Sequence, residues 1–297
     1  MLPIAAFVSV LAGLFSPEAA AVKQMTPQEK AALVVVSGLP APPGVGGVIV
    51  RRWDRTAPRP RGTLVFVDQE GGAVRAFPSL PPVQTAAALG GPGEAFAAGR
   101  ATGRALRGAG VHVDLAPVLD DPDGPLGRRH FRTPSDGVAF ARGLAAGRAG
   151  ACVKHFPGLG SASVSTDVRP HVPAVVRDGE LRTFRAAVAA GVPCVMTGHA
   201  FYRRLGRFRA SLEPGTYRLL RSLGFGGVAI TDSLDIVGEA PAYWPVRAIR
   251  AGADLLLFTS PRSARRAIVR LLPLARRGEL DAAVARVLRF RSRYLRP

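Results

Sequence analysis

The chain has 297 residues, of which 47% are hydrophobic, with 34 Gly, 26 Pro and only 2 Cys. This apolar content excludes a mainly disordered chain, and two cysteines exclude a disulfide-rich scaffold or a multi-cysteine zinc site. The 40 basic and 21 acidic residues give a formal net charge of +19, which favours polyanionic partners such as nucleic acid, anionic lipid or an acidic cell-wall polymer. The basic residues are spread along the whole chain, so the charge alone predicts no specific nucleic-acid site and equally fits an ordinary solvated surface rich in arginine.

The first 21 residues differ from the rest of the chain. Residues 1–15 are almost wholly apolar, too short a run to span a bilayer, and Ala19-Ala20-Ala21 follows soon after. We therefore predict a signal peptide over residues 1–21, no transmembrane span, and a secreted or envelope-associated protein. No lysine or arginine precedes the apolar run, so a first helix of the fold is the alternative.

Eight short apolar runs rich in Val, Ile or Leu follow the predicted leader. Such continuous runs are typical of strands that are buried on both faces, as in a parallel sheet. The predicted strands are residues 34–36, 47–50, 64–67, 111–118, 151–153, 193–196, 227–230 and 254–258. The cysteines at positions 152 and 194 lie inside two of them and are predicted to be buried free thiols.

Segments with helical spacing lie between most of these runs. Four of them end at or beside a glycine, a common helix stop: 94–110, 137–150, 178–191 and 213–224. Residues 263–296 also have a helical composition, interrupted at Pro273 and Gly278, whereas the first connection, 37–46, is too short for a full helix. The alternation predicts one α/β domain over residues 22–297, a parallel (β/α)8 TIM-type barrel with an irregular first β/α unit.

Polar residues concentrate where the predicted strands end, which is where barrels of this kind build their sites. Five consecutive strands lead to acidic and basic groups at Asp68, Asp114 and Asp120, Lys154 and His155, His199, and Asp232. Several charged groups at one rim favour a polyhydroxylated sugar, for which Asp68, Lys154 and His155 supply hydrogen bonds. The histidines fall on separate strands, which argues against a metal site, and the chain has no P-loop for a phosphate. The absence of a Gly-x-Ser-x-Gly elbow argues against an ordinary serine hydrolase. We expect no metal and no organic cofactor.

Four motifs in order resemble family-3 glycoside hydrolases, and most of all the single-domain bacterial β-N-acetylhexosaminidases. They are residues 67–72 (VDQEGG), 115–120 (LAPVLD), 154–158 (KHFPG) and 230–234 (ITDSL). The resemblance implies a retaining mechanism in which Asp232 is the nucleophile and forms a covalent glycosyl intermediate. It also implies that Asp68, Lys154 and His155 bind an N-acetylhexosamine.

Two further positions come from the same resemblance. Residues 126–131 (LGRRHF) are similar to a family loop whose arginine contacts the substrate, which is Arg129 in this chain. His199 stands where the family also carries a histidine after the sixth strand, and it is therefore included among the predicted substrate-binding residues.

The chain departs from the family pattern in the loop after the fifth strand. The bacterial enzymes place an Asp-x-His pair there, but Ser165 and Asp167 occupy those positions in this chain. Asp167 as the acid/base, His171 in its place, and a pocket that binds sugar without turnover are the three alternatives. Arg75 is one residue away from a family arginine and is assigned no contact, and Asp235 is interpreted as a helix-start residue.

The sequence thus predicts a glycoside hydrolase that releases terminal β-linked N-acetylhexosamine from cell-wall or related glycans. The predicted partners are this carbohydrate and an anionic cell-wall polymer, with no specific nucleic acid. The alternative from another class is a catalytically impaired glycan-binding or cell-wall-associated protein that retains the sugar pocket.

Overall fold

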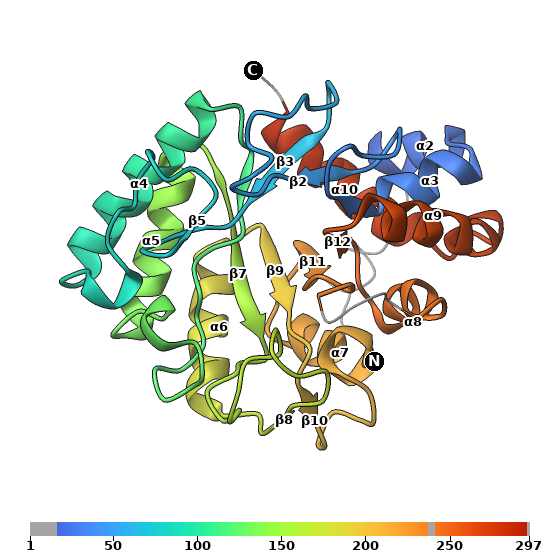
Figure 1. The fold of residues 1–297 in the computed structure, drawn as a ribbon. Helices are drawn as coiled ribbons and strands as arrows, with labels where there is room; N and C mark the ends of the chain where they lie inside the picture. Colours follow the sequence, from blue (N-terminus) through green and yellow to red (C-terminus); the bar gives the residue numbers. More distant parts are fainter. Residues whose placement is uncertain (1–16, 237–240, 296–297) are drawn as a thin grey trace, which may run out of the picture.

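The computed structural model describes residues 17–236 and 241–295. Its centre is a ring of eight short parallel strands, which Figure 1 shows surrounded by helices. The strands are β1 Val35–Ser37, β2 Gly47–Ile49, β3 Leu64–Val67, β6 Val113–Asp114, β7 Gly150–Phe156, β9 Cys194–Thr197, β11 Val228–Thr231 and β12 Leu256–Phe258. Each overlaps one of the eight apolar runs, although β7 extends beyond its run at both ends, and the strand residues are buried, as the continuous apolar pattern requires.

The sheet closes into a barrel. The strand order is β11-β9-β7-β6-β3-β2-β1-β12, and all neighbouring pairs are parallel. Ile230 of β11 and Leu255 beside β12 form a further parallel bridge, in which the Thr231 amide donates to the Leu255 carbonyl at 3.0 Å. The prediction of a single TIM-type barrel is therefore confirmed.

Helices cover the outside of the barrel. Figure 1 shows α4 (Pro92–Gly108), α5 (Pro134–Ala146) and α6 (Asp178–Ala189) on one side of the strands. The other side carries α7 (Pro214–Ser222), α8 (Trp244–Ala251), α9 (Pro261–Arg276) and α10 (Asp281–Tyr294). Pro273 lies inside α9 without ending it, whereas Gly278, with φ +73°, separates α9 from α10.

The irregular part of the barrel is larger than predicted. The chain between β1 and β2 forms no helix, as expected, but residues 50–63 between β2 and β3, all of them described, form none either. This segment contains two prolines and Gly62 in a left-handed conformation, so it forms a series of turns and no helix.

A disulfide joins the two cysteines, so the prediction of free thiols is wrong. Cys152 on β7 and Cys194 on β9 are register partners in neighbouring strands, with their Cα atoms 4.4 Å apart. Parallel pairing therefore brings together two side chains that are 42 residues apart in the chain. Apolar surroundings alone could not reveal that pairing.

Two helices precede the barrel: α2 (Pro17–Gln24) and α3 (Pro27–Leu33). Thr26 and Glu29 form a capping box at the start of α3, and Val22 of α2 is buried. Residues 1–16 of the predicted signal peptide lie outside the described residues, and its expected end near Ala21 falls within α2. Within the described ranges, no helix has the length and apolar composition needed to cross a membrane.

Candidate active site

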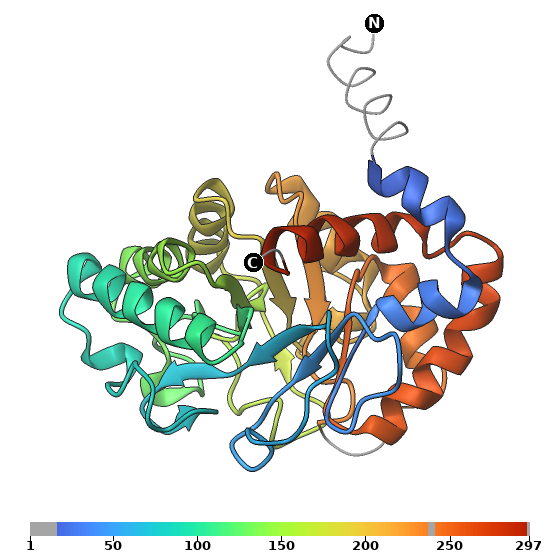
Figure 2. The same ribbon diagram turned by 90° about the horizontal axis from the view of Figure 1, so that it is seen from above.

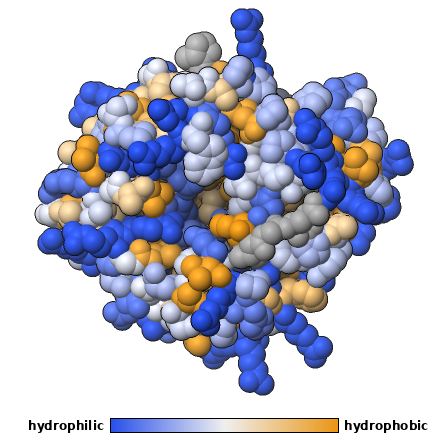
Figure 3. Space-filling view, in the orientation of Figure 1, coloured by the Kyte–Doolittle hydropathy of each residue, from blue (hydrophilic) through white to orange (hydrophobic). Residues whose placement is uncertain are grey.

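The carboxyl ends of the strands gather the predicted site residues on one face. In Figure 2 the gold and orange strands β9 and β11 point away from α2, toward the loops at the lower edge. That side faces the viewer in Figure 3, which shows a hollow near its centre with hydrophilic residues along it. Asp68 directly follows β3, Lys154 and His155 lie near the end of β7, and Asp232 directly follows β11.

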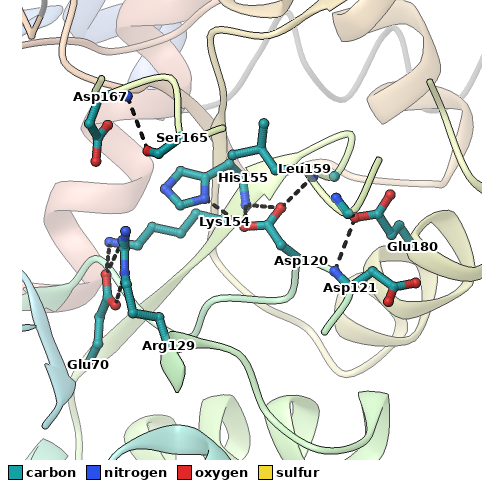
Figure 4. A network of polar contacts seen from close by, with 12 residues as sticks. Glu70, Asp120, Asp121, Arg129, Lys154, His155, Leu159, Ser165, Asp167 and Glu180 are labelled. Atoms are coloured by element: carbon teal, nitrogen blue, oxygen red, sulfur yellow. Dashed lines mark hydrogen bonds and ion pairs between the residues drawn. The ribbon is translucent and has the colours of Figure 1, made fainter. Parts of the chain in front are cut away.

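A four-residue ion network forms one wall of the site. Lys154 Nζ lies 2.6 Å from Asp68 Oδ1 and 2.6 Å from Glu70 Oε1. Arg129 donates two hydrogen bonds to the same Glu70 carboxylate, at 2.8 and 2.9 Å. Figure 4 shows Lys154 and Arg129 converging on Glu70. The sequence had pointed to three of these four side chains.

Glu70 holds the two cations in place. Burial alone would raise the pKa of Glu70, but the charges of Lys154 and Arg129 outweigh it and lower the pKa to about 2. Glu70 is therefore ionised throughout the physiological range. The side chain of Asp68 is 38% exposed, against 3% for Lys154, so Asp68 is the most solvent-accessible member of the network.

Asp120 fixes the orientation of His155. One Asp120 oxygen lies 2.7 Å from His155 Nδ1, and the other accepts the Leu159 amide at 2.8 Å. The His155 backbone amide also points at this carboxylate, at 3.2 Å. The ring presents Nδ1 to Asp120, which leaves Nε2 as the nitrogen that can bind a ligand.

Asp232 is a buried carboxylate that remains ionised. Its Oδ1 accepts the Ser233 amide at 2.7 Å, and the residue is 8% exposed. Burial alone would raise the pKa of Asp232, but His199, His155, the Ser233 amide and Lys154 together lower it. An ionised, poorly solvated carboxylate at a strand end is chemically suited to nucleophilic attack.

His199 uses both ring nitrogens within the protein. Nε2 lies 2.8 Å from the Ser233 carbonyl, an acceptor, and Nδ1 lies 2.8 Å from the Ser211 hydroxyl. Burial lowers the pKa of His199, so the ring is neutral at pH 7 with Nε2 as the donor. This contact anchors the residue that follows Asp232.

Asp167 lies on the loop after β7, exposed and next to the ion network. Its amide donates to Ser165 Oγ at 3.2 Å. Burial alone would lower the pKa of Arg129; Glu70 outweighs this, and Asp167 is among the further charges that raise it. In Figure 4, Asp167 and Ser165 lie above the Lys154–Glu70–Arg129 group, beside His155.

Other polar residues noted in the sequence are engaged elsewhere. His171 is exposed and packs against Phe201, with ring centroids 4.1 Å apart. Asp235 accepts the amides of Thr259 and Ser260, which fixes the start of α9. Arg75 donates to the nearby Gly72 and Pro78 carbonyls. None of these three contacts involves the ion network or Asp232.

Within residues 17–236 and 241–295, no group of three or more His, Cys, Asp or Glu side chains is arranged to hold a metal ion.

A protein-family model identifies the family of the chain. The model described as the glycosyl hydrolase family 3 N terminal domain matches residues 50–290, which span the barrel from the end of β2 to α10. The chain belongs to glycosyl hydrolase family 3. The predicted membership and the predicted glycoside hydrolase class are therefore confirmed.

Named relatives in family 3 agree with this assignment. The chain is 33% identical over 232 residues to a protein called beta-hexosaminidase in Stenotrophomonas maltophilia, and the match covers 69% of each chain. It is 35% identical over 225 residues to a protein described as an uncharacterized secreted glycosyl hydrolase of Arthroderma benhamiae. That second match covers 65% of this chain and 62% of the fungal protein.

Solved structures of family 3 share the fold. A glycosyl hydrolase of Mycobacterium smegmatis superposes with a TM-score of 0.80 at 28% identity, covering 92% of this chain and 98% of that one. A β-N-acetylglucosaminidase of Paenibacillus sp. also gives a TM-score of 0.80, at 27% identity. The match covers 91% of this chain and 62% of the Paenibacillus chain.

Three carboxylates that hold this family-3 site together were not predicted as site residues. Glu70 lies inside the first motif, and Asp120 ends the second but has no binding or catalytic role assigned from the sequence. Glu180 on α6 accepts the amides of Asp121 and Gly160, at 3.1 and 2.7 Å, and so secures the base of the Asp167 loop. The only signal in the sequence was the position of Glu70 and Asp120 within the motifs.

Proposed function

We propose that the chain is a retaining β-N-acetylhexosaminidase that releases terminal β-linked N-acetylhexosamine from cell-wall or related glycans. The observation that carries the proposal is Asp232, a buried carboxylate with a lowered pKa at the end of β11. Lys154 and His155, which contribute to that lowered pKa, lie on a neighbouring part of the rim with Asp68 and Arg129. The relatives called beta-hexosaminidase support this substrate class.

The proposed reaction has two steps. Asp232 attacks the anomeric carbon while the glycosidic bond breaks, and Asp167 gives its proton to the departing oxygen. Asp167, now a carboxylate, then takes a proton from water, whose oxygen displaces Asp232 from the sugar. Both displacements invert the anomeric centre, so the released sugar keeps the β configuration.

The remaining polar residues have binding roles in this proposal. Asp68 and Lys154 hydrogen-bond sugar hydroxyls, and His155 does so through Nε2 because Nδ1 faces Asp120. Arg129, held by Glu70, presents its remaining N–H groups to the substrate. His199, which the sequence placed among the sugar contacts, acts through Ser233 beside Asp232.

We further propose export of the protein, with residues 1–21 as signal peptide. The buried Cys152–Cys194 disulfide supports this, since disulfides form and persist mainly in oxidising compartments. A relative described as secreted is consistent with it. The positive charge would suit contact with an anionic cell-wall polymer.

The second candidate is a glycan-binding protein without turnover, favoured by one observation. Asp167 is exposed, and the Asp-x-His pair implied by the family resemblance is replaced by Ser165 and Asp167. Under this alternative the pocket would bind N-acetylhexosamine but leave the glycosidic bond intact.

Turnover of a 4-nitrophenyl N-acetyl-β-glucosaminide distinguishes the two candidates. Its activated leaving group needs little protonation, so the proposed enzyme releases nitrophenol even with a weak acid. Asp232→Asn should abolish turnover and retain sugar binding, whereas the exposed Asp123→Asn should change neither. Saturable sugar binding by the wild-type protein without any nitrophenol release would instead establish the binding protein.

A further inference from the structure

A small lobe stands beside the candidate active site. It is formed by residues 168–175 and 201–208, which contain the paired strands β8 (Pro173–Ala174) and β10 (Phe201–Tyr202). The Phe201 amide donates to the Val172 carbonyl at 2.8 Å, and Arg209 donates to the Pro170 carbonyl at 3.0 Å. Figure 1 shows β8 and β10 together at the lower edge of the molecule.

The lobe continues directly from two segments of the site. Val168 follows Asp167, and Phe201 comes two residues after His199. In the proposed reaction Asp167 protonates the leaving group, which therefore departs on the side of this loop. The part of a substrate beyond the cleaved bond would consequently meet the lobe.

The lobe carries four exposed arginines whose charges are not neutralised by the protein. None of these side chains forms a hydrogen bond or an ion pair with any residue in the described ranges; they are Arg169, Arg203, Arg204 and Arg207. The neighbouring Glu213 is buried and accepts the backbone amides of Arg207 and Phe208 instead. Free guanidinium groups are strong, planar partners for carboxylates and phosphates.

Exposed apolar side chains lie among these arginines. Val168 is 69% exposed and Val175 60%, while Phe208 is also exposed and has the Arg247 guanidinium over its ring. Figure 3 shows orange patches and protruding blue side chains together along the lower rim of this face. A surface that mixes cationic and apolar groups suits a polysaccharide, which offers anionic substituents along with C–H faces of its sugar rings.

We propose that this lobe binds the anionic part of a polymeric glycan and thereby holds the terminal sugar near Asp232. The inference rests on the proposed function, because the polymer must end in the sugar that the pocket takes. Once the polymer is bound to the lobe, its terminal sugar is present at a high effective concentration beside the site. A glycan fits better than a lipid surface because the lobe is continuous with the loop that carries Asp167.

Binding to polygalacturonate tests the lobe, with the same polymer fully methyl-esterified as the uncharged control. We expect the wild-type protein to bind the anionic polymer, more weakly as salt rises, and not to bind the ester. Replacing the four lobe arginines with glutamine should weaken binding about tenfold or more. The matched control carries the same charge loss on the outer helices α4, α6 and α7: Arg100→Gln, Arg104→Gln, Arg185→Gln and Arg218→Gln. It should bind within about twofold of the wild type.

Three outcomes would overturn the proposal. Equal losses in both quadruple variants would mean that net charge, and not the lobe, attracts the polymer. Equal binding of the methyl ester would exclude the anionic groups as the recognised feature. Lobe-dependent binding to phosphatidylglycerol vesicles without binding to polygalacturonate would make the partner a membrane.

The neutral nitrophenyl substrate separates this proposal from the proposed function. The lobe variant should turn it over as fast as the wild type, because that substrate does not reach the lobe. A wild-type protein that binds polygalacturonate through the lobe but never releases nitrophenol would disprove the hydrolase and leave the binding surface standing.

Discussion

Glu70→Gln removes the carboxylate that holds both Lys154 and Arg129. The pKa of Glu70 is lowered from 4.5 to about 2 in the folded protein, and each unit corresponds to about 1.4 kcal/mol. Because the folded-state pKa is the lower one, this stabilisation is fully present above pH 4.5 and disappears as the pH falls toward 2. The variant should therefore lose about 3 kcal/mol of unfolding free energy at pH 7 but only about 1 kcal/mol at pH 3.

Urea unfolding at the two pH values measures this difference. Asp123→Asn is the control, because the Asp123 side chain is 82% exposed and lies 3.8 Å from its nearest cation. That variant should stay within about 0.5 kcal/mol of the wild type at both pH values. A Glu70→Gln loss below about 1 kcal/mol at pH 7, or a loss that does not shrink on acidification, would refute the assignment of Glu70 as the anchor of the network.

Three further predictions follow from particular contacts. Asp167→Asn should lower kcat for an alkyl N-acetyl-β-glucosaminide by about 10²–10⁴-fold, but by less than about tenfold for a dinitrophenyl glycoside; equal losses on both would exclude Asp167 as the acid. Replacing both Cys152 and Cys194 with alanine opens a disulfide between residues 42 apart and should lower the unfolding free energy by about 4 kcal/mol. Urea titration checks that loss, and one below about 1 kcal/mol would contradict the stabilising role. Burial raises the pKa of Glu180 to about 7, so the folded state holds this proton more tightly than the unfolded state does. The free energy of unfolding should therefore decrease as the pH rises from 4.5 to 7. Glu180→Gln should remove this decline, so its melting temperature should rise relative to that of the wild type from about pH 5 to about pH 8, and parallel curves would contradict the shift.

The barrel was predictable because each buried strand carries its own signal. Short continuous runs such as Leu64–Val67 and Val228–Thr231 have no polar side to expose, and glycines mark the ends of the helices between them. The absence of a helix after β2 was harder to predict than that after β1, because residues 50–63 are long enough for a helix and only their prolines interrupt it.

The contacts within the site were only partly accessible from sequence. The motifs indicated Asp68, Lys154 and Asp232, but not that Glu70 would neutralise Lys154 across the rim, since that pairing joins β7 to the loop after β3. The disulfide could not be predicted for a similar reason, because it also joins residues on different strands. Register between β7 and β9 decides whether Cys152 meets Cys194, and register is a property of the closed sheet.

Trapping the covalent intermediate tests the role of Asp232 as nucleophile most directly. Incubation with a slowly hydrolysed fluorinated N-acetyl-β-glucosaminyl donor, followed by denaturation, proteolysis and mass spectrometry, identifies the residue that carries the sugar. We expect one labelled peptide, with the sugar on Asp232, and no label in Asp232→Asn. A sugar attached to any other residue, or turnover of this donor with release of the α-anomer, would contradict it.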